Sequence, residues 1–242
     1  MEKPVTPYGR AGNSKKAEVE EMFDNIAPKY DLLNHLLTFG IDIQWRKRCI
    51  RELRKYNPKV VVDIATGTAD FAVAAKKLNP DQIIGIDISN EMLEVGRVKI
   101  KQKKLDHLIE LRQGDSEALQ LEDNSVDAIT VGFGVRNFEN LKLGLSEMLR
   151  VLRPGGGVAI LEPSFPTAFP MKQLFQFYFA YITPLIGKMV SGDTAAYTYL
   201  PASVKAFPNG NEFTQICKEV GYSKAIYKPL TFGSCSMYIL EK

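Results

Sequence analysis

The stretch from Val60 to Phe71 constrains the fold of this chain more than any other. Consecutive β-branched and apolar residues from Val60 to Ile64 predict a buried strand. An apolar-periodic segment from Phe71 to Leu78 predicts a helix. Small residues occupy every second position of the turn between them: Ala65, Gly67 and Ala69. They allow a ligand to approach the backbone without a clash with Cβ atoms. A strand, a tight turn and a helix form the first unit of a nucleotide-binding α/β domain.

The spacing of this turn indicates which nucleoside cofactor it holds. A dinucleotide-binding turn has the pattern Gly-x-Gly-x-x-Gly, whereas here small residues alternate after Asp63. This spacing fits the loop that binds S-adenosylmethionine (SAM) better. Asp87 ends the next predicted strand, Gln82 to Ile88, about 20 residues after Gly67, where a carboxylate accepts hydrogen bonds from both ribose hydroxyls. The alternative is an ordinary strand, turn and helix in which Asp70 only caps the helix.

Alternation of strands and helices continues along the chain and predicts a doubly wound sheet with helices on both faces. Further strands are predicted at Ile109–Gln113, Asp127–Gly132 and Val158–Leu161, further helices at Glu91–Lys103, Leu141–Leu152 and Gly210–Val220, and a closing antiparallel pair at Lys224–Tyr227 and Ser234–Leu240. Ligands of such sheets bind beyond the carboxyl ends of the strands. We therefore expect one pocket to be lined by residues far apart in the sequence: Thr68, Asp87, Asp115, Arg136 and Glu162.

Length and composition exclude several classes of protein. A chain of 242 residues with 45% apolar residues can bury the core of one large α/β domain. Its net charge of +3 is too small to argue for nucleic acid. The three cysteines are widely separated, which indicates neither a metal site nor a disulfide framework and favours a reducing, cytoplasmic setting. The polar N-terminus predicts no signal peptide, and the longest apolar-leaning run, Leu174–Gly187, is shorter than the roughly 20 residues of a membrane span.

Two segments lie outside the regular alternation of what we expect to be a single domain, residues 1–242. Residues 1–56 predict a helical extension that breaks at Pro28 and ends in a basic amphipathic helix, Trp45–Tyr56. Residues 165–208 are too long for a plain connection. They carry ten aromatic side chains: Phe165, Phe169, Phe175, Phe177, Tyr178, Phe179, Tyr181, Tyr197, Tyr199 and Phe207. We interpret this insert as a cover over an apolar substrate; the alternatives are a homodimer interface and simple core.

Four motifs together resemble the ubiquinone/menaquinone biosynthesis C-methyltransferases, the UbiE/MenG family, and the resemblance covers nearly the whole chain. The motifs are Tyr30–Asn34 through Trp45, Phe133–Asn137, Arg150–Gly156 through Glu162 and Ser164, and Tyr199–Val204. The chain departs from the family pattern at three positions. Thr38 stands where a serine is common, Asp42 where a histidine is common, and Ala69 where many members have glycine.

The resemblance implies a class I SAM-methyltransferase fold and SAM-dependent methylation of a ring carbon on a reduced, prenylated quinone precursor. The Ala-Thr-Gly-Thr loop is similar to that of menaquinone-making members, so we expect demethylmenaquinol as the acceptor. The alternatives are the benzoquinol intermediate of ubiquinone biosynthesis, another lipid-like acceptor such as a sterol or tocopherol precursor, and a binding protein without activity. A prenylated acceptor also implies peripheral contact with the inner face of the membrane.

The residues expected to contact SAM come from three strand ends: Asp63, Ala65, Gly67, Thr68, Asp87, Asp115 and Ser116. In the family pattern, Thr68 faces the amino acid moiety of the cofactor and Asp87 faces the ribose. The pair Asp115–Ser116 lies near the adenine edge. A simpler role for Asp115 is that of a turn residue after Gly114.

Ring methylation determines which catalytic residues to look for. An aromatic carbon attacks the sulfonium methyl only after a neighbouring phenol loses its proton, and no metal is required. Arg136 is the first candidate to stabilise the phenolate, because a guanidinium is always charged; the alternative is a structural pair with Glu162. The candidate bases Asp31 and Tyr30 lie in the N-terminal motif, where His35 ranks below Asp31.

Overall fold

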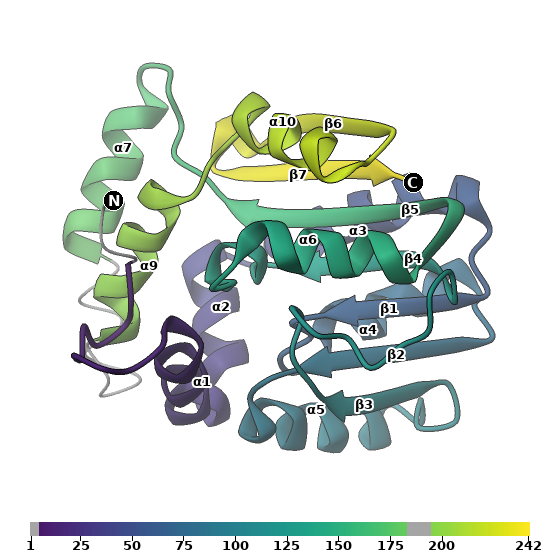
Figure 1. The fold of residues 1–242 in the computed structure, drawn as a ribbon. Helices are drawn as coiled ribbons and strands as arrows, with labels where there is room; N and C mark the ends of the chain where they lie inside the picture. Colours follow the sequence, from purple (N-terminus) through teal and green to yellow (C-terminus); the bar gives the residue numbers. More distant parts are fainter. Residues whose placement is uncertain (1–4, 183–194) are drawn as a thin grey trace.

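A seven-stranded sheet forms the centre of the computed structural model, which describes residues 5–182 and 195–242 (Figure 1). The strand order is β3-β2-β1-β4-β5-β7-β6, and β7 runs antiparallel to its neighbours. The strands are β1 (Val60–Ile64), β2 (Gln82–Asp87), β3 (Ile109–Gln113), β4 (Val126–Gly132), β5 (Leu152–Pro163), β6 (Lys224–Leu230) and β7 (Cys235–Glu241). This confirms the doubly wound sheet and the antiparallel closing pair that the sequence predicted.

Helices cover both faces of the sheet (Figure 1). One face packs against α3 (Asp42–Leu53) and α4 (Asp70–Ala75), and the other against α6 (Leu141–Val151) and α10 (Asn211–Val220). β1 lies between β2 and β4, and its residues Val61, Val62 and Ile64 are fully buried. The apolar character of β1, broken only by the buried Asp63, follows from this position, because a parallel strand covered on both faces has no solvated side.

The start of β5 differs from the prediction. The Arg153–Gly156 stretch, which separates the predicted helix Leu141–Leu152 from the predicted strand Val158–Leu161, lies inside β5, which begins at Leu152 instead of Val158. The pairing of β4 and β5 shifts register between Val126 and Ala128. A Cβ atom on Gly156 would lie 2.8 Å from the carbonyl oxygen of Asp127. The glycines therefore allow the irregular start of the strand to approach β4 closely.

Four helices gather beyond the carboxyl ends of the parallel strands (Figure 1). They are α1 (Lys15–Ile26), α2 (Tyr30–Thr38), α7 (Met171–Phe177) and α9 (Ala195–Ala206). Pro28 lies in the 3₁₀ turn Ala27–Lys29 between α1 and α2, at the predicted break. Another helix, α5 (Asn90–Gln102), follows β2 and is capped by Ser89, whose hydroxyl accepts a hydrogen bond from the Met92 amide.

The predicted cover, residues 165–208, is described only in part. It contains α7, a π-helical turn at Tyr178–Ile182 and α9, whereas residues 183–194 lie outside the described residues, as do the side chains of Phe179 and Tyr197. Within the described ranges, no helix has both the length and the apolar character that crossing a membrane requires.

The loops that follow β1 and β4 approach each other so closely that only glycine fits at one position. A Cβ atom on Gly134 would lie 2.4 Å from the Cβ of Ala65. We predict that Gly134→Ala lowers the free energy of unfolding by about 1–3 kcal/mol, the usual cost of overpacking. Ala65→Gly in the same chain should restore most of the loss, because it removes the clashing atom. Urea denaturation of the two variants checks this; equal stability of Gly134→Ala and wild type would contradict it.

Candidate active site

The loop after β1 is held in shape by the buried carboxylate of Asp63. It accepts hydrogen bonds from the hydroxyls of Thr66 and Thr130, both at 2.6 Å, and from the Ala72 amide at 3.0 Å. Burial raises the pKa of Asp63 to about 6, although these bonds favour the charged form. All the small residues of the loop have positive φ angles: Ala65, Gly67 and Ala69. Asp63 therefore stabilises a left-handed turn that larger side chains would disfavour.

Asp87, at the end of β2, faces this loop. Its Oδ2 accepts a hydrogen bond of 2.7 Å from the Gly67 amide, and its Oδ1 accepts one of 2.9 Å from the Ser89 amide. Burial raises the pKa of Asp87 to about 6. A carboxylate has about four acceptor positions, so each oxygen retains capacity for one hydroxyl donor. This arrangement suits recognition of a ribose diol.

The first pocket brings together five of the seven residues predicted to contact the cofactor: Ala65, Gly67, Asp87, Asp115 and Ser116. Helix α1 forms its opposite wall, where Lys16 pairs with Asp115 at 2.5 Å and with Glu117 at 3.4 Å. The other two predicted residues, Asp63 and Thr68, line a smaller adjacent pocket behind the loop. Which of these seven contact the cofactor stays a prediction.

A second, larger cavity of about 380 Å³ lies beside the first pocket, and its lining is mainly apolar. Side chains of α1, α2, α7 and α9 contribute to it, including Phe23, Leu33 and Leu174. The described part of the insert, residues 165–182 and 195–208, therefore helps to enclose an apolar space. Such a volume lies within the usual range for binding sites of small organic ligands.

Tyr30 and Phe133 stand where the pockets meet, because both line the first pocket, the apolar cavity and the small pocket behind the loop. Tyr30 packs edge-to-face on Phe23, with ring centroids 6.0 Å apart. Burial raises the pKa of Tyr30 to about 12, although Arg136 and Arg46 oppose the shift. Its phenol therefore keeps its proton near pH 7.

Arg136 lines the apolar cavity and pairs with Glu162 at the same time. Its Nη1 lies 3.1 Å from Oε2 of the fully buried Glu162 and also donates to the Phe133 carbonyl. Its Nε is buried and has no hydrogen-bond partner among the described residues. Both predicted roles are thus compatible, since the pair with Glu162 occupies Nη1 and leaves the Nε–H without a partner in the described part of the chain. The pKa of Glu162 is raised by burial, against the opposing effect of Arg136.

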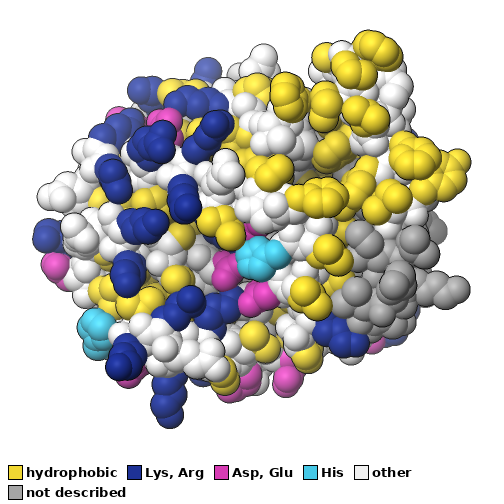
Figure 2. All heavy atoms as spheres, turned by 180° about the vertical axis from the view of Figure 1, so that it is seen from behind, with side chains coloured by type: hydrophobic (Ala, Val, Ile, Leu, Met, Phe, Trp, Pro, Cys, Tyr) yellow, Lys and Arg dark blue, Asp and Glu magenta, His cyan; other side chains and the backbone are white. Residues whose placement is uncertain are grey.

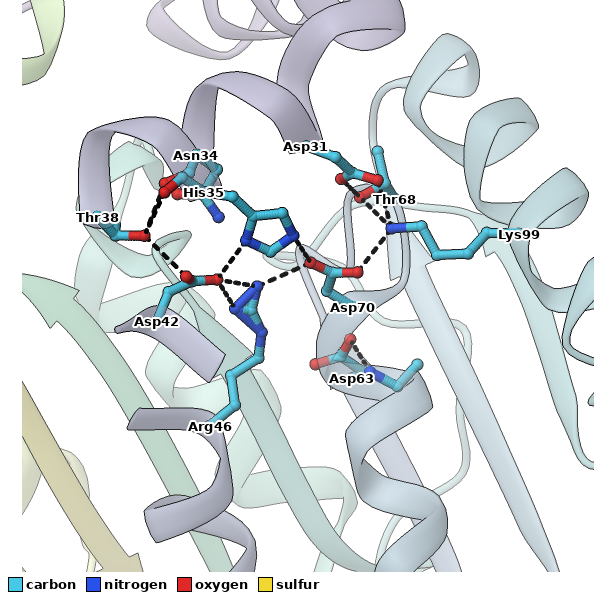
Figure 3. A network of polar contacts seen from close by, with 11 residues as sticks. Asp31, Asn34, His35, Thr38, Asp42, Arg46, Asp63, Thr68, Asp70 and Lys99 are labelled. Carbon is cyan, nitrogen blue, oxygen red and sulfur yellow. Dashed lines mark hydrogen bonds and ion pairs between the residues drawn. The ribbon is translucent and has the colours of Figure 1, made fainter. Parts of the chain in front are cut away.

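Asp31 does not line the apolar cavity; its carboxylate belongs to a polar network on the other side of α2 (Figure 3). It accepts hydrogen bonds from the Thr68 hydroxyl and, at 2.6 Å, from Lys99 Nζ. Lys99 also donates to Thr68 Oγ1 at 3.1 Å and to Asp70 Oδ1 at 2.6 Å. Burial opposes ionisation of Asp70, but Lys99 and Arg46 hold its pKa below the usual value.

The same network continues to His35 and Asp42 (Figure 3). Nδ1 of His35 lies 3.0 Å from Asp42 Oδ2, and Nε2 lies 3.6 Å from Asp70 Oδ2. Arg46 donates to the same two carboxylate oxygens at 2.7 and 2.8 Å. A guanidinium therefore already neutralises the carboxylates that could otherwise hold a metal ion with His35. Thr38 donates to Asp42 Oδ1 at 2.7 Å, so two of the three departures from the family pattern contact each other.

Sequence reasoning missed three residues of the site. Lys99 lies in a run of lysines and arginines that is typical of a solvated helix end, yet its side chain is only 15% exposed. Arg46 is similarly hidden in the basic helix α3. Asn34 lines both the apolar cavity and the small pocket, and its amide makes no hydrogen bond to a described residue. The signal for Asn34 was present, because it follows Tyr30 by four residues and shares its helix face.

The fold and these pockets define a class of protein. Among solved structures, the chain is similar to a SAM-dependent methyltransferase from Thermotoga maritima, with a TM-score of 0.62 and 17% identity over 92% of this chain and 99% of that chain. It is also similar to a SAM-dependent methyltransferase from Aquifex aeolicus, with a TM-score of 0.55 and 16% identity over 75% of this chain and 81% of that one. The fold is that of the class I SAM-dependent methyltransferases, as predicted.

Comparison of amino-acid sequences identifies the family more narrowly than the fold does. A protein from Bacteroides fragilis named demethylmenaquinone methyltransferase is 48% identical over 239 residues, which cover 98% of this chain and 97% of that protein. One of the same name from Chlorobaculum tepidum is 41% identical over 232 residues, 94% of this chain and 93% of that protein. The profile of the ubiE/COQ5 methyltransferase family matches residues 11–242. The chain belongs to this family, which confirms the resemblance.

Proposed function

We propose that the protein is a SAM-dependent C-methyltransferase that converts demethylmenaquinol to menaquinol. The observation that carries the proposal is the meeting of two unlike pockets at Tyr30 and Phe133. One pocket presents Asp87 to a nucleoside, and the other is a mainly apolar cavity suited to a hydrophobic ring and its tail. The names of the relatives from Bacteroides fragilis and Chlorobaculum tepidum favour this acceptor over a benzoquinol.

The residues of the first pocket fit SAM. Asp87 can accept both ribose hydroxyls, because the Gly67 and Ser89 amides each occupy one acceptor position on a different oxygen and a carboxylate has about four. Ile88, Met92 and Phe138 offer apolar contacts to an adenine ring. When bound, SAM supplies an electrophilic methyl group on a sulfonium sulfur. We propose that the loop residues Ala65 and Gly67 hold it with that methyl toward Tyr30 and Phe133.

We propose that three polar groups of the apolar cavity bind the quinol. They are the Tyr30 hydroxyl, the Asn34 amide and Arg136 Nε, none of which has a hydrogen-bond partner among the described residues. We propose that Arg136 stabilises the phenolate that activates the ring carbon, while Tyr30 and Asn34 orient the ring hydroxyls. Donors that are already in place need not reorganise as charge develops on the oxygen.

The mechanism relies on a positive field at the acceptor oxygen. The described residues that line the apolar cavity include no aspartate, glutamate or histidine. Tyr30 is neutral near pH 7 because its pKa is raised to about 12 by burial. We propose that Arg136 lowers the pKa of the quinol hydroxyl, so that its proton can leave to water. Asp31, one of the candidate bases expected from the sequence, then acts by positioning α2.

The direct test of the proposed function is an assay with purified protein. We expect incubation with SAM and reduced, short-tailed demethylmenaquinol to give menaquinol, detected by mass spectrometry as the addition of one methyl group to the ring. The benzoquinol precursor of ubiquinone, offered under the same conditions, should be methylated more slowly. Methylation of neither quinol, by protein that binds SAM, would contradict the proposal.

Arg136→Lys tests the role of the guanidinium. Lysine retains a cation opposite Glu162, so we expect the melting temperature and the SAM affinity to change little. It removes the planar fork with its free Nε–H, and loss of one such donor lowers a rate by about 10²- to 10³-fold. The measurement is the single-turnover rate, with the exposed Arg112→Lys as a matched control. A folded Arg136→Lys protein with a normal rate would remove Arg136 from the mechanism.

The affinity for SAM should depend on pH through Asp87. Since burial raises its pKa to about 6, the carboxyl of the free protein is increasingly protonated below that pH. Binding of the ribose diol requires the ionised form, so the dissociation constant should rise as the pH falls below about 6, by up to about tenfold per pH unit. Asp87→Asn should bind weakly with a flat profile. A slope that survives in Asp87→Asn would assign the titration to another group, such as Asp63.

Peripheral contact with a membrane is a further part of the proposal. Large apolar side chains are exposed on or beside the segments that line the apolar cavity: Leu32, Phe39, Ile43, Phe169, Leu174, Phe177, Tyr181 and Phe232. Figure 2 shows hydrophobic side chains gathered on one side of the rear face, away from the Lys and Arg side chains that dominate the other side. A prenylated quinol resides in the bilayer, so we propose that this surface contacts the cytoplasmic face of the membrane. The alternative occupant is a second copy of the chain.

Vesicle sedimentation distinguishes a membrane from a second copy of the chain as the partner of this surface. We expect the protein to sediment with phospholipid vesicles and the double variant Phe39→Asp/Phe232→Asp to remain in the supernatant, because a charge at the interface is costly to bury. Val98→Asp replaces another exposed apolar residue, on α5, and should sediment like the wild type. A protein that ignores vesicles but forms a dimer broken by the double variant would assign the surface to self-association.

A further inference from the structure

Lys99 ties three separate segments together behind the cofactor loop (Figure 3). An ammonium group has three N–H donors, and Lys99 uses them on Asp31 of α2, Thr68 of the loop and Asp70 at the start of α4. Thr68 in turn donates its hydroxyl proton to Asp31. The side chain of Lys99 is 15% exposed, so these interactions are less screened than those of a surface salt bridge.

The helix held by Lys99 also forms a wall of the acceptor cavity. Asp31 and His35 of α2 face the polar network, whereas Tyr30, Leu33 and Asn34 of the same helix line the apolar cavity. The cofactor loop, Gly67 and Thr68, lies between the first pocket and this network. The shared contacts of Thr68, Lys99 and Asp31 therefore connect the loop directly to α2.

We propose that Lys99 is a positioning residue that clasps α2 to the cofactor loop, so that filling the cofactor pocket fixes the wall of the acceptor cavity. This inference rests on the proposed function, because it assumes that a quinol enters that cavity. The cofactor packs on the preformed Gly67–Thr68 turn and so restrains the oxygen of Thr68 in its place toward Lys99. Lys99 then holds Asp31, which places Tyr30 and Asn34 for the ring. Cofactor binding then strengthens the affinity for the acceptor by some factor. By thermodynamic linkage, the acceptor must strengthen cofactor binding by the same factor.

The test measures this coupling in the full-length protein. Calorimetry gives the affinity for S-adenosylhomocysteine with and without saturating, oxidised demethylmenaquinone that carries a single isoprene unit. We expect the quinone to strengthen S-adenosylhomocysteine binding about tenfold in the wild type, a typical coupling factor. In Lys99→Met the factor should fall to about one. Lys101→Met, on the exposed side of α5, should retain the wild-type factor.

A second readout does not depend on methyl transfer. Hydrogen exchange of the α2 amides should slow when S-adenosylhomocysteine binds the wild type and Lys101→Met, but not when it binds Lys99→Met or Asp31→Asn. The double variant Lys99→Met/Asp31→Asn should lose no further coupling. Unchanged coupling and α2 protection in Lys99→Met would overturn the clasp. If S-adenosylhomocysteine slows exchange of the α2 amides in the wild type but the wild type methylates no quinol, the proposed function is overturned. The role of Lys99 in joining α2 to the cofactor loop would then still hold.

Discussion

The buried carboxylate of Asp63 is the interaction on which the rest of the site depends. It joins β1 to Thr130 of β4, to Thr66 of the loop and to the first turn of α4 through Ala72. Burying a carboxylate is unfavourable, and its pKa, raised to about 6, reflects that cost. Three hydrogen bonds offset it and fix the left-handed turn that presents the Gly67 amide to Asp87. The nucleoside pocket and the close approach of the β4 loop follow from this one arrangement.

The distribution of charge separates the two tasks of the site. Carboxylates and cations of the network, from Asp31 through Asp70 to Asp42, lie behind the cofactor loop and neutralise one another. The cavity that we assign to the acceptor has a single described charged side chain in its lining, Arg136. In a mostly apolar surrounding, that charge acts on a phenolate more strongly than it would in water. Exclusion of water also favours methyl transfer, because the charged reactants become neutral products.

Local patterns allowed much of the fold and of the nucleoside pocket to be predicted. The bounds of β1 and β3 are those expected, and Ala65, Gly67, Asp87, Asp115 and Ser116 line one pocket. These predictions succeeded because a strand end and the residues after it are contiguous, and because parallel strands end at one edge of the sheet.

The partners of α2 could not be predicted in the same way. Asp31 contacts Lys99, 68 positions later, and the exposed basic run around Lys99 gives no sign that one of its members turns inward. Nothing in the local pattern indicates that Arg46 pairs with both Asp42 and Asp70. The early start of β5 was missed because Pro154 and the glycines after it usually end a regular element, whereas here they permit an irregular pairing with β4. Ion pairs between distant elements depend on the completed tertiary structure.

A crystal structure with S-adenosylhomocysteine and a demethylmenaquinone analogue tests the central claim most directly, namely that two unlike pockets meet at the point of methyl transfer. The account predicts that the ribose hydroxyls bind Asp87, that the sulfur lies beside Tyr30 and Phe133, and that the quinone ring enters the apolar cavity with one oxygen on Arg136 Nε. A ring bound elsewhere, or an adenosyl group that leaves Asp87 without a ribose contact, would contradict it.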